Sequence, residues 1–191
     1  MTRRRGMSLA GQYLVLQLLI VLAVLVAVVA ISLAQSAAAF ERVEGRRALS
    51  AAEALGNNPT VRALLPSAEP RGGSALPAVA ESVRTVSGSS RVTLARPDGT
   101  VVASSDPSLL GRGLELGSSR VMEGRAWTGV VGGTETPMLS AHVPVLDDTG
   151  AMIGIASISR NYPSTWERLG DAVPNLLTYL GVASVLGVAG S

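Results

Sequence analysis

The sequence contains no cysteine and no lysine, and it has one histidine, His142, among its 191 residues. Ordinary zinc and iron–sulfur sites need several cysteine or histidine ligands, so we expect no metal and no other cofactor. The nucleophile-elbow pattern G-x-S-x-G, the phosphate-binding loop G-x-x-x-x-G-K-[ST] and a helix-opening G-x-G-x-x-G are also missing. His142 lies beside no nucleophile signature, and we predict no catalytic domain in this chain.

Since lysine is absent, all 16 basic residues are arginines, and their positions explain the pI of 9.7. Arg3, Arg4 and Arg5 precede an apolar segment. The other 13 arginines, Arg42 to Arg168, are interspersed with 14 acidic residues, which gives that region a net charge of −1. A basic tail before a first membrane span is typical of the cytoplasmic side, whereas a nucleic-acid-binding surface needs clustered basic residues. We therefore predict a membrane protein with no nucleic-acid partner.

The apolar segment after the basic tail runs from Tyr13 to Ala34, 22 residues without a charge. About 20 apolar residues cross a bilayer as a helix, so we predict a cytoplasmic tail at 1–12 and a transmembrane helix at 13–35. A cleaved signal peptide is the alternative, because Ala37, Ala38 and Ala39 resemble a cleavage site. Its apolar region is normally only about 7–15 residues long, which favours the anchor.

A second uncharged stretch, 173–191, covers the last 19 residues. We predict that it begins a second transmembrane helix, with a soluble helix as the alternative. Glycine is more frequent in membrane helices than in soluble ones, and this stretch contains several. The region between the two spans, 36–172, is then one extracytoplasmic domain.

The domain pattern changes from helical to strand-like after Gly88. Helices are predicted at 36–55, 60–65 and 77–86, and strands at 91–95, 100–104, 126–131, 138–145 and 151–160. Tight turns rich in Asp and Gly join the first two strands and the last two. This order predicts an α+β fold with a five-stranded antiparallel sheet and a long N-terminal helix.

The strand predicted at 138–145 has two different faces. Leu139, Ala141, Val143 and Val145 alternate onto one face, which we assign to the core. Ser140 and His142 share the other face with Met138. A small-molecule pocket combines a few polar groups with apolar ones in this way, and a solvent-facing strand shows the same pattern. The sequence leaves both open.

Three stretches resemble the extracytoplasmic PAS-like domains of citrate and C4-dicarboxylate sensor histidine kinases. They are RPDGTVVASSDPSLLGRGL (Arg96–Leu114), EGRAWTGVVGGTETPMLSAHVPVLDDTG (Glu123–Gly150) and AMIGIASIS (Ala151–Ser159). The resemblance implies a PAS-like fold that binds a small molecule, acts as a homodimer, and signals to a response regulator through a cytoplasmic part beyond this chain.

The chain departs from this family at the carboxylate-binding positions. Where the family has an arginine, a histidine and a second arginine, this chain has Val101, Ser104 and Ser140. Serine does not replace the charge and fork geometry of arginine, so binding of citrate or fumarate in the family's manner is not expected. The ligand-site residues that we select are Ser104, Thr128, Thr134, Ser140 and His142, with Arg120 as a further candidate. Ordinary hydrogen bonding within strands or loops is the alternative for each.

We therefore predict a membrane-bound receptor in the cell membrane, the sensor portion of a two-component histidine kinase. Two other classes stay open at this point. The same outside domain occurs in chemoreceptors and other signalling proteins, and the chain is also compatible with a stand-alone anchored interaction protein.

Overall fold

The computed structural model describes residues 9–71, 73–132 and 137–162. The chain divides into two compact units, one formed by Met1–Ala38 and Thr165–Ser191 and the other by Ala39–Ser164. The basic tail Arg3–Arg5 and the predicted second span, 173–191, lie outside the described residues.

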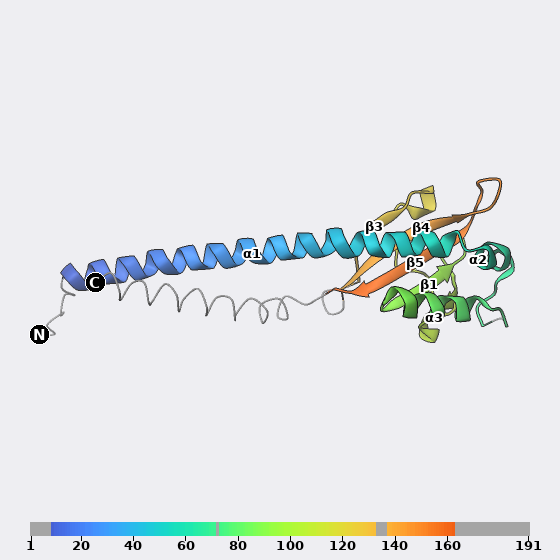
Figure 1. Ribbon diagram of the computed structural model, residues 1–191, viewed down its shortest axis with the longest axis horizontal. Coiled ribbons are helices and arrows are strands. Elements are labelled where there is room, and N and C mark those ends of the chain that lie inside the picture. The colour runs from blue at the N-terminus through green and yellow to red at the C-terminus, as the bar shows by residue number, and fades with distance from the viewer. Residues whose placement is uncertain (1–8, 72, 133–136, 163–191) are drawn as a thin grey trace, which may run out of the picture. The chain divides into compact units, whose positions relative to one another are not determined.

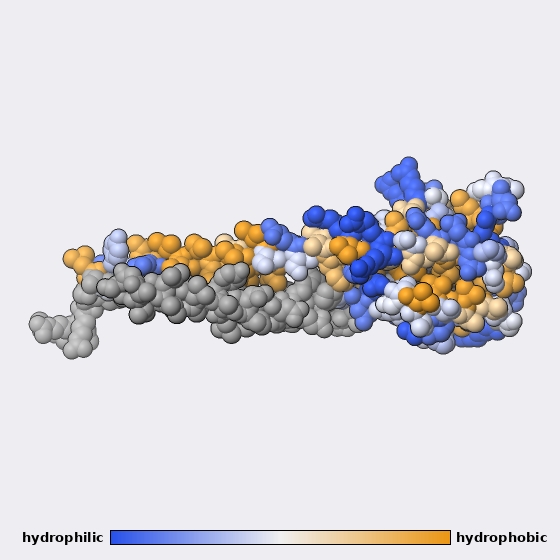
Figure 2. Space-filling model, in the orientation of Figure 1, coloured by the Kyte–Doolittle hydropathy of each residue, from blue (hydrophilic) through white to orange (hydrophobic). Residues whose placement is uncertain are grey.

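Helix α1 (Leu9–Gly56) is one continuous helix of 48 residues. The part from Gly11 has a mean hydropathy of 3.3 in its most apolar window, and it is the one helix of the described residues long and apolar enough to cross a membrane. Figure 2 shows apolar side chains along its N-terminal part. Its C-terminal part loses this apolar coat and buries Ala48, Ala52 and Leu55 against the sheet.

Two further helices follow after short breaks (Figure 1). Helix α2 (Pro59–Leu64) begins where Asn58 Oδ1 accepts a hydrogen bond from the Thr60 N–H at 2.9 Å, with Pro59 in the first turn. It continues into the 3-10 turn η1 (Leu65–Ser67). Helix α3 (Leu76–Ser87) ends at Gly88, whose φ of 62° is the left-handed conformation that glycine accepts without strain.

The sheet contains the five predicted strands in the order β2-β1-β5-β4-β3, and every neighbouring pair is antiparallel. The strands are β1 (Arg91–Ala95), β2 (Val101–Ser104), β3 (Trp127–Val131), β4 (Met138–Leu146) and β5 (Met152–Asn161). The last strand lies in the middle of the sheet, between β1 and β4. Two short 3-10 turns, η2 (Pro107–Leu109) and η3 (Val121–Glu123), lie between β2 and β3.

The main core lies between one face of the sheet and the helices. Side chains from β1, β4 and β5 meet those of α1, α2, η1 and α3 there; examples from the strands are Leu94, Ala141 and Ile158. Packing is tight where β5 passes under η1. A Cβ on Gly154 would lie 2.4 Å from Leu65 Cδ2, so glycine is required at this crossing.

Candidate functional site

The face of the sheet that points away from the helices is polar. Alternate strand residues point to opposite faces, and those facing the helices form the main core. The intervening side chains include six polar residues, each of which is at most 7% exposed: Thr93, Ser104, Ser140, His142, Ser157 and Ser159. We call these six the polar face. They account for all but one of the buried polar residues in the described part of the chain, the other being Ser89.

Strand register places these residues in two rows across the sheet. One row runs from Ser104 through Thr93, Ser157 and His142 to Trp127, one residue from each strand in the order of the sheet. The adjacent row is Arg91, Ser159, Ser140 and Gly129. The pairing of β1 with β5 thus makes direct neighbours of residues more than 60 positions apart in the sequence, such as Arg91 and Ser159.

The connection between β2 and β3 covers part of this face. Val121, in η3, is fully buried and forms a small apolar cluster with Ala95 of β1 and Ile155 of β5. Leu114 and Leu116 pack at its edge. The polar rows lie farther along the same strands, so a second apolar core borders the polar face at one end. Ser140 and His142 themselves are 0% and 1% exposed, which excludes the solvent-facing alternative for both.

His142 is the most unusual residue of the polar face. It is 1% exposed, and its ring stacks on that of Trp127 with centroids 5.3 Å apart and an interplanar angle of 7°. Neither Nδ1 nor Nε2 has a hydrogen-bond partner among the described residues. Burial lowers the pKa of His142 to about 4 from 6.5. The imidazole is therefore neutral near pH 7, and it has one donor and one acceptor nitrogen to offer.

Ser157 is the cross-strand neighbour of His142 on β5. Its hydroxyl makes no hydrogen bond to any other described residue, whereas the other hydroxyls of the polar face are paired. An unpaired buried polar group costs roughly 1–3 kcal/mol. The two nitrogens of His142 are such groups, and together with the unpaired Ser157 hydroxyl beside them they mark the point at which a ligand gains most by supplying hydrogen bonds.

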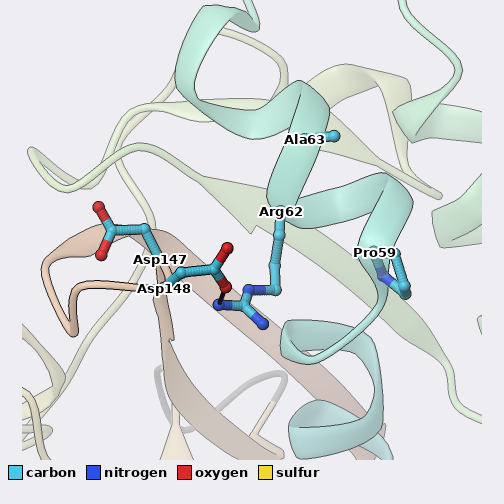
Figure 3. A pocket seen from close by; sticks show the side chains of 5 residues that line it. All are labelled: Pro59, Arg62, Ala63, Asp147 and Asp148. Atoms are coloured by element: carbon cyan, nitrogen blue, oxygen red, sulfur yellow. Dashed lines mark hydrogen bonds and ion pairs between the residues drawn. The ribbon is translucent and has the colours of Figure 1, made fainter.

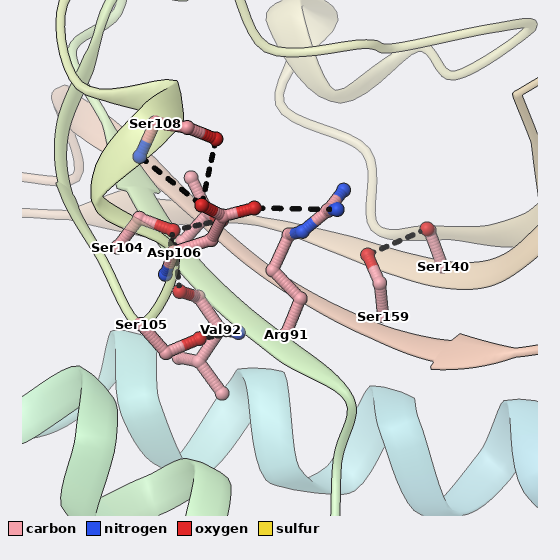
Figure 4. A network of polar contacts seen from close by, with 9 residues as sticks. Arg91, Val92, Ser104, Ser105, Asp106, Ser108, Ser140 and Ser159 are labelled. Atoms are coloured by element: carbon pink, nitrogen blue, oxygen red, sulfur yellow. Dashed lines mark hydrogen bonds and ion pairs between the residues drawn. The ribbon is translucent and has the colours of Figure 1, made fainter.

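The other serines of the polar face are paired with each other or with the backbone (Figure 4). Ser140 and Ser159 join β4 to β5 through a hydroxyl–hydroxyl contact of 2.8 Å. Ser104 Oγ lies 3.1 Å from Thr93 Oγ1 and accepts a hydrogen bond from the Asp106 N–H at 3.1 Å. These contacts fix strand spacing and the turn after β2, and leave the hydroxyls with limited spare capacity.

A charged pair stands at the edge of the polar face. Arg91 Nη2 lies 3.5 Å from Asp106 Oδ2, and the two side chains are about one-third exposed (Figure 4). Asp106 Oδ1 accepts hydrogen bonds from the hydroxyl and the N–H of Ser108 at 2.7 and 3.1 Å, which lower the pKa of the Asp106 carboxyl. The carboxylate is thus held in its charged form beside Arg91.

The structure brings together three of the six residues selected from the sequence: Ser104, Ser140 and His142 belong to the polar face. Thr128 lies on the opposite face of β3, toward α1: a Cβ added to Gly45 of α1 would lie 3.8 Å from the Cβ of Thr128. The Thr128 side chain is exposed. Arg120 is exposed at the start of η3. Thr134 lies outside the described residues.

Sequence reasoning missed Thr93, Ser157, Ser159, Trp127 and Arg91. The alternation of Ser157 and Ser159 with Ile158 in β5 is a two-residue period that marks one polar face of a strand. The same test applied to β1 selects Arg91 and Thr93. No local pattern places Trp127 over His142, since that contact depends on the pairing of β3 with β4.

A second polar feature lies at the other end of the sheet, beside α2. Pro59, Arg62, Ala63, Asp147 and Asp148 surround an open depression of about 300 Å³ (Figure 3). Arg62 Nη2 lies 2.6 Å from Asp148 Oδ1, and Arg62 Nε donates to the Leu146 carbonyl at 2.9 Å. These contacts hold the β4–β5 turn against α2. This structural role explains why Arg62 and Asp148 lie together, and no ligand is needed to explain it.

Comparisons with known proteins identify the class. The family model "Single cache domain 3" matches residues 35–174, and the chain belongs to this family. A curated relative, "Sensor protein CitS" from Halalkalibacterium halodurans, is 26% identical over 159 residues. The match covers 82% of this chain and 29% of the relative, so the chain spans less than a third of the relative's length.

Two solved structures share the fold. The sensor domain of E. coli DcuS aligns with a TM-score of 0.56 at 20% identity, covering 63% of this chain and 90% of that domain. The sensor domain of the V. cholerae histidine kinase DctB aligns with a TM-score of 0.55 at 15% identity, covering 72% and 56%. The resemblance to sensor-kinase domains and the predicted fold class are thereby confirmed.

Proposed function

We propose that this chain is the sensing part of a membrane-bound two-component receptor, which binds a small molecule outside the cytoplasm and passes the signal through the membrane. The observation that carries the proposal is His142, a buried imidazole with two unpartnered nitrogens on the polar face of a cache-family sheet. Buried polar groups are normally hydrogen-bonded. A ligand that bridges His142 and Ser157 would complete both.

The membrane arrangement in this proposal is supported by charge and hydropathy. The apolar part of α1 fits an anchor, and the Arg3–Arg5 tail before it favours the cytoplasm for the N-terminus. The domain after it then lies outside. We further propose that the receptor is a homodimer, and that a histidine kinase region beyond this chain passes the signal to a response regulator.

Strand β5 is the element best placed to carry the signal. Ser157 and Ser159 point from it into the polar face, whereas Arg160 points to the helix side and lies 2.7 Å from Glu44 of α1. In the sequence, β5 is the last strand before the predicted second span at 173–191. A ligand shifts the equilibrium between two signalling states of a receptor only if it binds them with different affinity.

The binding step can be tested by thermal unfolding of the full 191-residue chain in detergent, with a panel of small carboxylates, amino acids and neutral metabolites. A ligand present at about 100 times its Kd adds about 2.7 kcal/mol to the stability. The variant His142→Phe keeps a ring to stack on Trp127 and removes both nitrogens, so it should lose the shift. Val86→Ala, at an exposed position on α3, is the matched control. A panel in which no compound stabilises the protein would contradict the proposal.

Transmission needs a separate measurement. Residues 1–191 can be joined to the kinase region of a sensor histidine kinase and reconstituted in liposomes. A ligand found by thermal unfolding should change the autophosphorylation rate of this chimera, and His142→Phe should remove the change. Binding without any change in rate would retain the binding site and reject the signalling role.

A further inference from the structure

The positive charge available to the polar face is small. The chain has no lysine, and the five strands contain two arginines, Arg91 and Arg160. Arg160 points to the helix side, where it pairs with Glu44. In the segment that joins β2 to β3, the side chains of Arg112, Arg120 and Arg125 are exposed to solvent. Arg91 is thus the arginine of the described strands that adjoins the polar face.

Arg91 is already compensated. Its guanidinium lies 3.5 Å from the carboxylate of Asp106, so the pair itself is neutral, and Arg112, which also acts on this carboxylate, is exposed to solvent. Asp106 is anchored by Ser108 and lies next to Ser104, so it stays near the rows even when Arg91 moves. An anion that recruits Arg91 therefore meets a carboxylate at the same place.

The inner part of the polar face is neutral. It consists of five hydroxyl side chains and His142, which is uncharged near neutral pH because burial disfavours its protonated form. Hydroxyls and a neutral imidazole both donate and accept hydrogen bonds. These side chains can therefore form hydrogen bonds with the amide and hydroxyl groups of a ligand, and with the two opposite charges of a zwitterionic ligand. A dianion would be buried without an opposing charge, which is far more costly than burial of a hydrogen-bonded neutral group.

We infer that the ligand of the polar face is a hydrogen-bonding small molecule without net charge, either uncharged or zwitterionic, and not a dicarboxylate. This inference rests on the proposed sensing function, since it concerns the ligand class of the same site. His142 and Ser157 supply the free hydrogen-bonding groups, and the Arg91–Asp106 pair gives the edge of the site both signs of charge.

The test compares probes that differ in charge at nearly constant shape: succinamide with succinate, glutaramide with glutarate, and glutamine with glutamate. Binding to the full chain in detergent is measured by calorimetry at pH 7 and matched ionic strength. We expect the net-neutral member of a pair to bind at least tenfold more tightly. A preference for the more anionic member overturns the inference and leaves the sensing function standing.

If the wild-type protein binds none of these probe compounds, two variants still test the inference. His142→Lys places a cation in the row of Ser157, and Ser140→Arg places one in the adjacent row, so the second remains informative if the first does not fold. Gain of succinate or glutarate binding in a folded variant supports the inference, because the face then admits ligands and lacked the charge. No binding to wild type or to either folded variant overturns both the inference and the sensing function.

Discussion

Arg160 Nη1 of β5 lies 2.7 Å from Glu44 Oε2 of α1, and both side chains are largely buried. Arg160 also donates from Nη2 to the carbonyl of Ser87 at the end of α3. Glu44 Oε1 in turn accepts from Arg47 at 2.9 Å. One arginine thus connects the central strand with two helices, directly beside Ser159 of the polar face.

Removal of the Glu44 charge should destabilise the domain, because Arg160 would keep its charge in a poorly solvated place. We expect Glu44→Gln to lower the free energy of unfolding by about 1.5–3 kcal/mol, the range for hydrogen bonds to charged groups. Chemical denaturation of the full chain measures it. Glu81→Gln is the matched control, since Glu81 forms a solvent-exposed pair with Arg84 on α3, and its effect should be clearly smaller. Equal effects would show that burial of the Arg160–Glu44 pair is unimportant.

The depressed pKa of His142 predicts a specific pH dependence of stability. The group binds a proton in the unfolded state below about pH 6.5 and in the folded state only below about pH 4. Between these values the unfolded state holds more protons, so stability falls as the pH decreases, by up to about 1.4 kcal/mol per pH unit. Denaturation curves at pH 7, 6 and 5 measure the slope.

The variant His142→Phe should remove most of this slope. Asp98, Asp106 and Asp147 also have lowered pKa values because of hydrogen bonds to their carboxylates. Their contribution is lost only as the pH falls through the acidic range below their ordinary value near 3.8, so it does not overlap with the window above pH 5. A slope that persists in His142→Phe would assign the effect to another group.

Gly129 makes room for the ring that covers His142. A Cβ at this position would lie 2.3 Å from Trp127 Cζ2, so Gly129→Ala must displace the indole. We expect the imidazole to become more solvated and its pKa to rise toward the ordinary value. Because the chain has one histidine, a proton NMR titration of the imidazole measures this directly. Val130→Ala, the next residue on β3 and on the other face, should leave the titration unchanged; a shift of similar size there would refute the explanation.

Gly154 is required for a different reason. A Cβ there would lie 2.4 Å from Leu65 Cδ2 and 2.6 Å from the carbonyl oxygen of Ala95, and the second atom belongs to the backbone of the neighbouring strand. Overpacking of this kind costs about 1–3 kcal/mol, which thermal or chemical unfolding of Gly154→Ala should show. Gly73→Ala meets no atom within 4 Å and should be close to neutral. If both variants unfold like wild type, β5 and η1 are not tightly packed.

Much of the fold could be predicted because local signals agree with it. The helix breaker Gly56-Asn57-Asn58-Pro59 ends α1 at Gly56, and the predicted strand 91–95 coincides with β1. The predicted strand 138–145 ends one residue short of β4, at Leu146. Caps, turns and two-residue alternation act over a few residues, so they can be recognised without knowing what packs against them.

The candidate site could be predicted only in part. Alternation put Ser140 and His142 on one face of β4, and the sequence alone also separated a basic tail and an apolar segment from a nearly neutral domain. Only the tertiary structure decided that Ser140 and His142 are buried, the second against the ring of Trp127. Likewise, only the strand order made Ser157 and Trp127 the neighbours of His142. Alternation determines which side chains share a face, whereas their neighbours depend on contacts between distant segments that no local pattern contains.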